Sequence, residues 1–223
     1  MPQFSSGGVE VLGRITKRTE AAAAIDEYVI PRSQVVAAHH EELSGVGRVH
    51  IDVLFSQQRP GHLVVVLSVG RRSAEPVVRV QSSCLYGETF GSLGCDCHDQ
   101  LHESLARMRA AGSGILVYLD QEGRGAGLTV KALAYELAER LDFDTFDAYS
   151  QLGFEHDLRA YGDAVRVLKL LEVGSCVLLT NNPAKVRALE DADITVRRQA
   201  LWAQKGTLGQ RARATRRAHG YLD

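Results

Sequence analysis

Apolar and polar side chains follow strand-like patterns from Val49 onward. Residues 49–55 alternate between the two, which is typical of a half-buried strand, and residues 63–69 form a continuous apolar run. Between them lies Arg59-Pro-Gly-His, whose proline and glycine favour a tight turn. Residues 49–69 are therefore predicted to form a β-hairpin, and a further strand over residues 76–81 leads directly into Cys84.

Helical spacing of apolar side chains is found in the second part of the chain. Helices are predicted from Cys97 to about Gly112, along the stripe from Val130 to Leu141, over residues 158–171 and over residues 183–190. A buried strand is predicted among them over residues 114–119, and further strands over residues 175–180 and 194–196. This alternation predicts an α/β or mixed α+β domain.

The composition indicates a globular protein with a small-molecule partner. The chain has 223 residues, of which 45% are hydrophobic, enough for one large or two small domains. Charged residues make up 24% but nearly cancel, at a net charge of −1, which argues against nucleic acid or an anionic membrane as the partner. The first residues lack the regions of a signal peptide and no long apolar stretch follows, so we expect a cytoplasmic protein.

Three of the four cysteines, Cys84, Cys95 and Cys97, lie within fourteen residues. In a reducing compartment such a cluster indicates a metal site rather than disulfides, and thiolates are strong ligands for zinc. Three ligands leave one coordination position for water, whose pKa falls from ~16 to ~7 on zinc. Cys176 lies in an apolar run and is predicted to be a core residue.

A glycine-rich loop, residues 121–127, lies between a predicted strand and a predicted helix. Loops in that position often hold phosphate groups, but the glycine spacing matches neither the dinucleotide fingerprint nor a Walker loop, so a simple tight turn is the alternative.

The two ends of the chain flank a predicted catalytic domain over residues 49–197. Residues 1–48 are treated as an N-terminal extension of unknown role, with His39 and His40 in a solvated loop. Residues 198–223 form a basic C-terminal segment. This segment is either a solvated tail or a patch that meets substrate phosphates, which a dimer interface could share.

Five motifs follow one another in the order of a known family, with near-family spacing over residues 50–196. They are Arg79-Val-Gln-Ser-Ser-Cys-Leu-Tyr-Gly, Ser92-Leu-Gly-Cys-Asp-Cys, Gln121-Glu-Gly-Arg, Gln151-Leu-Gly-Phe with Asp157-Leu-Arg, and Leu179-Thr-Asn-Asn-Pro-Ala-Lys. On these motifs the sequence resembles GTP cyclohydrolase II, the zinc enzyme that opens the imidazole ring of GTP in riboflavin synthesis. The resemblance implies a single catalytic domain with a mixed sheet flanked by helices, release of formate and pyrophosphate, and a homodimer.

The resemblance also implies a role for individual residues. Cys84, Cys95 and Cys97 would bind Zn²⁺, Asp157 would be the proton acceptor, Arg159 the nucleophile that takes the nucleotidyl group, and Tyr135 would lie near the reacting base. Mg²⁺ is expected with the triphosphate. The implied nucleotide pocket is lined by Arg79, Val80, Gln81, Ser82, Ser83, Gln100, Glu122, Gly123, Arg124, Thr145, Thr180 and Lys185.

The residue chemistry agrees with these roles. Glu122 could accept hydrogen bonds from guanine N1 and its exocyclic amine, a donor pattern that adenine lacks. Arg79, Arg124 and Lys185 supply positive charge for phosphates.

Several positions depart from the family pattern. Gln81 stands where histidine is usual, Ser83 where glutamate is usual, Gly94 where arginine is usual and His98 where glycine is usual. These changes favour an altered substrate, so a homologue acting on another purine or pyrimidine nucleotide, in salvage or specialised biosynthesis, is the first alternative. A non-catalytic nucleotide-binding protein with structural zinc is the second, and it requires a fourth protein ligand.

Overall fold

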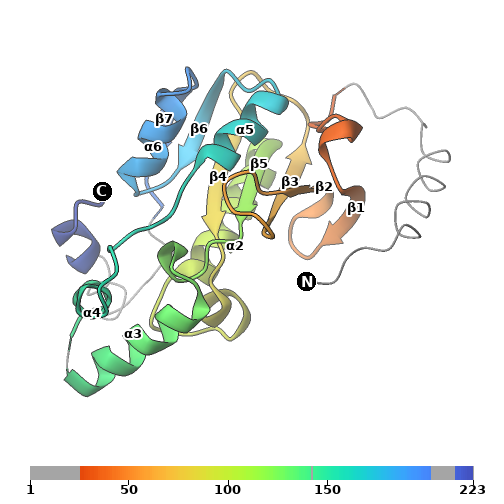
Figure 1. The fold of residues 1–223 in the computed structure, drawn as a ribbon. Coiled ribbons are helices and arrows are strands. Elements are labelled where there is room, and N and C mark those ends of the chain that lie inside the picture. Colours follow the sequence, from red (N-terminus) through yellow and green to blue (C-terminus); the bar gives the residue numbers. More distant parts are fainter. Residues whose placement is uncertain (1–25, 142, 202–213, 223) are drawn as a thin grey trace, which may run out of the picture.

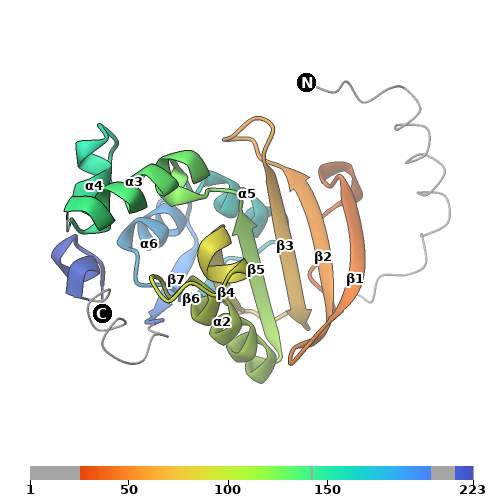
Figure 2. The same ribbon diagram turned by 90° about the horizontal axis from the view of Figure 1, so that it is seen from below.

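A seven-stranded mixed sheet forms the centre of the protein, with strand order β1-β2-β3-β5-β4-β6-β7 (Figures 1 and 2). The computed structural model describes residues 26–141, 143–201 and 214–222. Strands β1, β2, β3 and β5 are antiparallel neighbours, whereas β5, β4, β6 and β7 run parallel. The strands are β1 (Ala37–Leu43), β2 (Gly47–Phe55), β3 (Leu63–Gly70), β4 (Val77–Ser82), β5 (Ser113–Leu119), β6 (Ser175–Leu179) and β7 (Thr195–Gln199). The predicted mixed α/β fold is confirmed.

Helices cover both faces of this sheet (Figure 2). They are α2 (Cys97–Ala111), α3 (Leu128–Leu141), α4 (Thr145–Gln151), α5 (Gly162–Leu170) and α6 (Pro183–Glu190). The larger core lies between the sheet and α5 and α6, and a smaller one lies under α2, where Leu105 and Met108 meet Leu116. The contact of α2 with β5 is close, because a Cβ at Gly114 would lie 2.2 Å from Met108 Cγ. In the parts of the chain described, no helix has the length and apolar character that a membrane span requires.

Some local predictions differ from the structure. The predicted hairpin is present as β2 and β3, and His62 N–H donates to the Arg59 carbonyl in its turn. His39 and His40, however, lie in β1 and not in a loop, so that prediction was wrong. Strand β1 belongs to the residues assigned to an extension, yet it pairs with β2 along its whole length. Its side chains are largely exposed, so the apolar alternation that marks a half-buried strand in a sequence is absent.

The helix predicted from residue 158 begins later, at Gly162. The Leu158 N–H donates instead to the Arg124 carbonyl, so the residues around 158 bridge to the glycine loop. The buried Asp163 anchors the start of α5 by accepting hydrogen bonds from Ser56 Oγ at 2.5 Å and from Gln57 N at 3.0 Å.

Asp163→Asn should lower the free energy of unfolding by about 2 kcal/mol at pH 7, because the amide cannot accept all of these hydrogen bonds. Burial would raise the pKa of Asp163, but the bonds from Ser56, Gln57 and Gln58 outweigh it and hold that pKa below its ordinary value. The stabilisation is therefore complete above the unfolded pKa of about 3.9 and is lost as the pH falls through the folded pKa. Urea unfolding at pH 7 and pH 3 measures it, with the exposed Asp191→Asn as control. An equal difference at both pH values would contradict the assignment.

Strands β4, β5 and β6 are parallel, so their carboxyl ends meet at one edge of the sheet. Cys84 follows β4, Gln121 follows β5 and Thr180 follows β6. Ligands of such sheets bind beyond the carboxyl ends of the strands. The fold therefore brings the predicted site residues to this edge.

Candidate functional site

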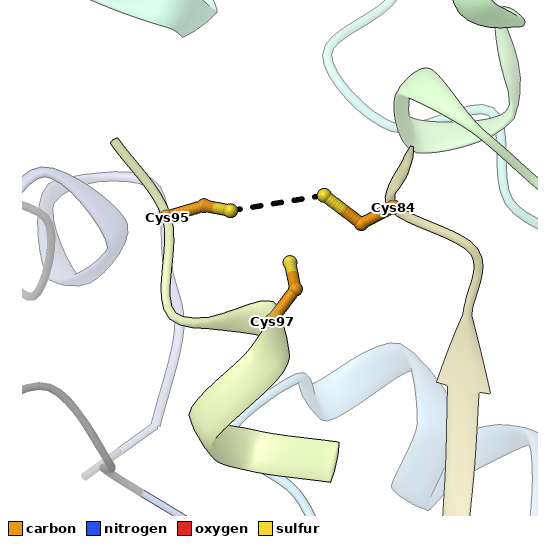
Figure 3. Close-up of side chains that lie close together, drawn as sticks. All are labelled: Cys84, Cys95 and Cys97. Atoms are coloured by element: carbon orange, nitrogen blue, oxygen red, sulfur yellow. Dashed lines mark hydrogen bonds between the residues drawn. The ribbon is translucent and has the colours of Figure 1, made fainter. Parts of the chain in front are cut away.

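The three clustered cysteines converge in the structure (Figure 3). Their sulfur atoms all lie within 4.8 Å of one another, and Cys84 Sγ is 3.7 Å from Cys95 Sγ. Cys84 comes from the end of β4, Cys95 from the following loop and Cys97 from the first turn of α2. Within the described residues, no histidine or carboxylate joins this group of potential metal ligands. Cys176 is fully buried in β6, as predicted for a core residue.

The surroundings of the sulfur atoms fit a bound metal ion. A π-helical turn, Leu85–Thr89, places Gly87 so close that a Cβ there would lie 2.5 Å from Cys95 Sγ. Lys131 Nζ lies 3.2 Å from Cys84 Sγ. Hydrogen bonds from Cys95 and Cys97, together with the charge of Lys131, hold the pKa of Cys84 well below its ordinary value. A set of three soft sulfur donors suits Zn²⁺.

A cavity of about 400 Å³ opens beside the sulfur atoms, in the size range of sites for small molecules. The predicted nucleotide residues line it, with the exception of Val80. Successive side chains of a strand point to opposite faces, so Val80 is buried in the core while Arg79 and Gln81 face the cavity. Val80 is therefore not a pocket-lining residue. It contributes its carbonyl oxygen, which accepts a hydrogen bond from Lys185 Nζ at 2.8 Å.

Three basic side chains face this cavity without a carboxylate partner. Within the described residues, no salt bridge reaches Arg79, Arg124 or Lys185. Burial lowers the pKa of Arg79 to about 10, and burial together with Arg79 and Arg159 holds the pKa of Lys185 well below its ordinary value. Arg124 Nη1 is buried without a hydrogen-bond partner. An anionic ligand would satisfy this donor and favour the charged form of Lys185.

Asp157 and Arg159 form a close pair beside the cavity. Arg159 Nε donates to Asp157 Oδ1 at 2.7 Å, and Arg159 Nη2 donates to Asp157 Oδ2. Burial would raise the pKa of Asp157, but Arg159 outweighs it and holds that pKa below its ordinary value. Arg159 lines the cavity, whereas Asp157 lies behind it. Asp157 is thus ionised at neutral pH and in contact with the guanidinium group.

Glu122 is engaged on both carboxylate oxygens. Its Oε2 accepts from Leu85 N–H at 2.6 Å, and its Oε1 accepts from Gly123 N–H and from Lys131 Nζ, each at 2.8 Å. Because each oxygen can accept about two hydrogen bonds, one acceptor position remains, on Oε2.

The glycine loop acts as a tight turn rather than as a phosphate cradle. The N–H groups of Gly125, Ala126 and Gly127 donate hydrogen bonds to carbonyl groups of residues 121–123. Arg124 adopts a positive φ of 54°, and a Cβ at Gly125 would lie 2.7 Å from the carbonyl carbon of Leu158. The loop therefore presents the Arg124 side chain to the cavity and packs against the Asp157–Arg159 segment.

Sequence reasoning missed two residues beside the sulfur atoms. Lys131 bridges Cys84 and Glu122, and its spacing of four from Tyr135 on α3 was the available signal. Glu88 accepts hydrogen bonds from Gln81 Nε2 and from Tyr118 Oη, both at 2.6 Å, and burial raises its pKa. Nothing in the local sequence separates Glu88 from a solvent-exposed glutamate.

Comparison with known proteins agrees with the resemblance found in the sequence motifs. A family model described as GTP cyclohydrolase II matches residues 40–200. The GTP cyclohydrolase-2 of Xylella fastidiosa (strain Temecula1) is 50% identical over 138 residues, which are 60% of this chain and 34% of that protein. The riboflavin biosynthesis protein RibBA of Bacillus cereus (strain G9842) is 40% identical over 202 residues, which are 83% of this chain and 50% of that protein. The chain thus spans between about a third and a half of the length of these relatives.

Proposed function

The chain belongs to the GTP cyclohydrolase II family, and from this premise we propose that it is a zinc-dependent hydrolase that opens the imidazole ring of a guanine nucleotide. GTP, the nucleotide in the family's name, is the default substrate against which others are compared, and formate and pyrophosphate are the released products. One observation carries the proposal: the three cysteine sulfurs and three basic side chains that have no carboxylate partner among the described residues share one cavity.

Zinc held by Cys84, Cys95 and Cys97 would supply an activated water for hydrolysis at neutral pH. The second alternative, structural zinc in a non-catalytic protein, needs a fourth protein ligand. Among the described residues the group offers three, which favours a position left open for water.

Binding and orientation of the nucleotide fall to the remaining residues. Arg79, Arg124 and Lys185 would bind the phosphates, with any Mg²⁺ arriving on the triphosphate. Glu122 would use its remaining acceptor position for a donor on guanine. Burial raises the pKa of Tyr135 to about 12, so its hydroxyl group is protonated at neutral pH and could donate to the reacting base.

The Asp157–Arg159 pair would serve the phosphate step. An N–P bond forms between Arg159 and the α-phosphorus, the P–O bond to pyrophosphate breaks, and the guanidinium proton passes to Asp157, with which it is already in contact. The nucleotidyl group must then be released by water. We further propose that the protein is cytoplasmic and forms a homodimer. Its mass in solution tests the dimer.

Formate release tests this function directly. Zinc-loaded protein is incubated with GTP, GDP, GMP and other purine and pyrimidine nucleotides, and the products are identified by mass spectrometry. Formate from at least one nucleotide is expected. Intact nucleotides throughout the panel, with zinc bound, would exclude the cyclohydrolase function.

We expect GTP not to be the preferred nucleotide in that panel, because the family's carboxylate is replaced at Ser83. Ser83 lines the cavity beside Cys84, and its Oγ accepts a hydrogen bond from Gln121 N–H at 3.1 Å. A missing charged contact changes specificity by roughly ten- to a hundred-fold. Ser83→Glu combined with Gln81→His should shift kcat/KM toward GTP.

Gln81→His alone is the matched control for this shift. Gln81 lines the cavity, but its amide already accepts from Arg79 Nε at 2.8 Å and donates to Glu88, so it is held in the supporting network. The effect should therefore depend on Ser83→Glu. A kcat/KM for GTP that exceeds that for every other nucleotide, unchanged in the double variant, would refute the altered preference.

A further inference from the structure

The end of the chain, residues 214–222, lies against the candidate site. Thr215, Arg216 and Tyr221 line the same cavity as the cysteines. The Leu222 N–H donates to the Asn181 carbonyl at 2.8 Å, which ties the segment to the loop after β6. A solvated tail, one of the two interpretations of the sequence, does not describe these residues. Lys205, Arg211 and Arg213 of the basic segment lie outside the described residues.

Arg216 holds the residue between two of the cysteines. Its two terminal nitrogens donate to the two carboxylate oxygens of Asp96, at 2.7 and 2.5 Å. The Asp96 side chain is 3% exposed and that of Arg216 is 20% exposed, so the pair is largely shielded from water. Because Cys95, Asp96 and Cys97 are consecutive, a bidentate contact to Asp96 fixes the turn that carries two of the three sulfurs.

The same contact continues into the sheet as a chain of hydrogen bonds. Gln100 Nε2 donates to Asp96 Oδ2 at 2.8 Å, and Arg79 Nη2 donates to Gln100 Oε1 at 2.6 Å. Arg79 in turn donates to Gln81, and Gln81 donates to Glu88. Arg216 is thus one end of a hydrogen-bond network that passes through Asp96, Gln100, Arg79 and Gln81 and ends at Glu88.

Two further contacts join the segment to the phosphate side of the cavity. Arg159 Nη2 donates to Tyr221 Oη at 2.7 Å, on the guanidinium group that also binds Asp157. The His219 ring stacks on Phe146 with centroids 3.8 Å apart, and the Arg124 guanidinium carbon lies 3.6 Å from the centroid of that ring. Residues 214–222 therefore contact three groups of the site. These are the Asp96 carboxylate in the cysteine turn, the Arg159 guanidinium group, and the Phe146 ring on which the Arg124 guanidinium group lies.

We propose that residues 214–222 complete the site, with Arg216 acting as the positioning residue for the cysteine turn through Asp96 and Tyr221 as the positioning residue for Arg159. The catalytic meaning of this inference rests on the proposed function, but the positioning of the cysteines does not. Arg216 acts through its planar fork, which binds both oxygens of one carboxylate, a geometry that lysine cannot reproduce.

Zinc release tests the role of Arg216. Full-length zinc-loaded protein is mixed with a chromogenic chelator, and the release rate is compared for the parent, Arg216→Ala and Arg216→Lys. Both variants should release zinc roughly ten- to a hundred-fold faster, the usual effect of losing a residue that orients a metal ligand. Arg197→Ala is the charge-matched control, since Arg197 forms an exposed ion pair with Glu75. Release at the parent rate in both variants would overturn the proposal.

Two further measurements exclude a role for Arg216 as a direct phosphate ligand only. In an Asp96→Asn background, Arg216→Ala should add little to the release rate, because the contact is already weakened. A direct phosphate ligand would instead leave zinc release unchanged and raise KM, and Arg216→Lys would largely restore it. That pattern would overturn the positioning role.

Metal-free protein gives a readout that needs neither zinc nor turnover. Ellman's reagent should modify Cys95 and Cys97 faster in Arg216→Ala than in the parent, with circular dichroism confirming that both are folded. If the parent releases no formate from any nucleotide while Arg216→Ala still accelerates zinc release and thiol modification, the proposed function fails and the positioning role stands. If the parent is active and neither rate changes, the positioning role fails alone.

Discussion

Replacing Cys95 and Cys97 together by serine should remove zinc and hydrolytic activity at once. The three sulfurs lie within 4.8 Å of one another, so the double variant leaves Cys84 as the one thiolate of the group. A hydroxyl group is a far weaker ligand for Zn²⁺ than a thiolate. Metal analysis after dialysis should show less than about a tenth of the parent's zinc content, on the order of a hundred-fold weaker binding.

Cys176→Ala is the matched control for this variant, because it removes a thiol that is buried in β6 and lies outside the ligand group found among the described residues. It should keep full zinc content. The zinc bound by the parent should also decrease on acidification, since protons compete for the thiolates. Full zinc occupancy in the double variant would refute the ligand assignment.

The sequence predicted those parts of the fold whose signal is local. The hairpin of β2 and β3 was evident because alternating strands flank a Pro-Gly turn, and α2 because a regular apolar stripe ends at Gly112, which adopts the left-handed conformation. Strand β1 escaped prediction because an exposed edge strand has no apolar face. Helix α4 escaped because its seven residues are too few to show a helical period.

The candidate site was likewise predictable only where the sequence signal is local or where the resemblance supplied it. Its cysteines are close in the sequence, and the resemblance supplied the pocket residues, which β4, β5 and β6 bring to one edge of the sheet. Contacts such as Arg216 to Asp96 join residues 120 positions apart, and no local pattern indicates them. Lys131 was missed for a different reason: an amphipathic helix is interpreted from its apolar stripe, so a single lysine is assigned to the polar face.

Arg159→Ala should reduce turnover by about 10³-fold or more, while leaving zinc content and fold unchanged. The guanidinium group faces the cavity and is held by Asp157 and by Tyr221, so its position is fixed before substrate binds. The variant removes the ion-pair partner of Asp157. That side chain is 28% exposed and still accepts from Asn182 Nδ2, so water can solvate the unpaired carboxylate. Single-turnover kinetics of pyrophosphate and formate release measure the two chemical steps separately.

Arg159→Lys separates a specific guanidinium role from a simple need for positive charge. The ammonium group keeps the charge but loses the two-point contact with Asp157, by which proton transfer to the carboxylate is arranged. If the phosphate step proceeds through Arg159, the lysine variant should be nearly as slow as the alanine variant in pyrophosphate release. Arg140→Ala, which removes an exposed arginine of α3 paired with Glu136, is the control and should turn over at the parent rate. Turnover of Arg159→Ala at that same rate would show that the assigned role is wrong, and rescue by lysine would reduce Arg159 to an electrostatic contact with the phosphates.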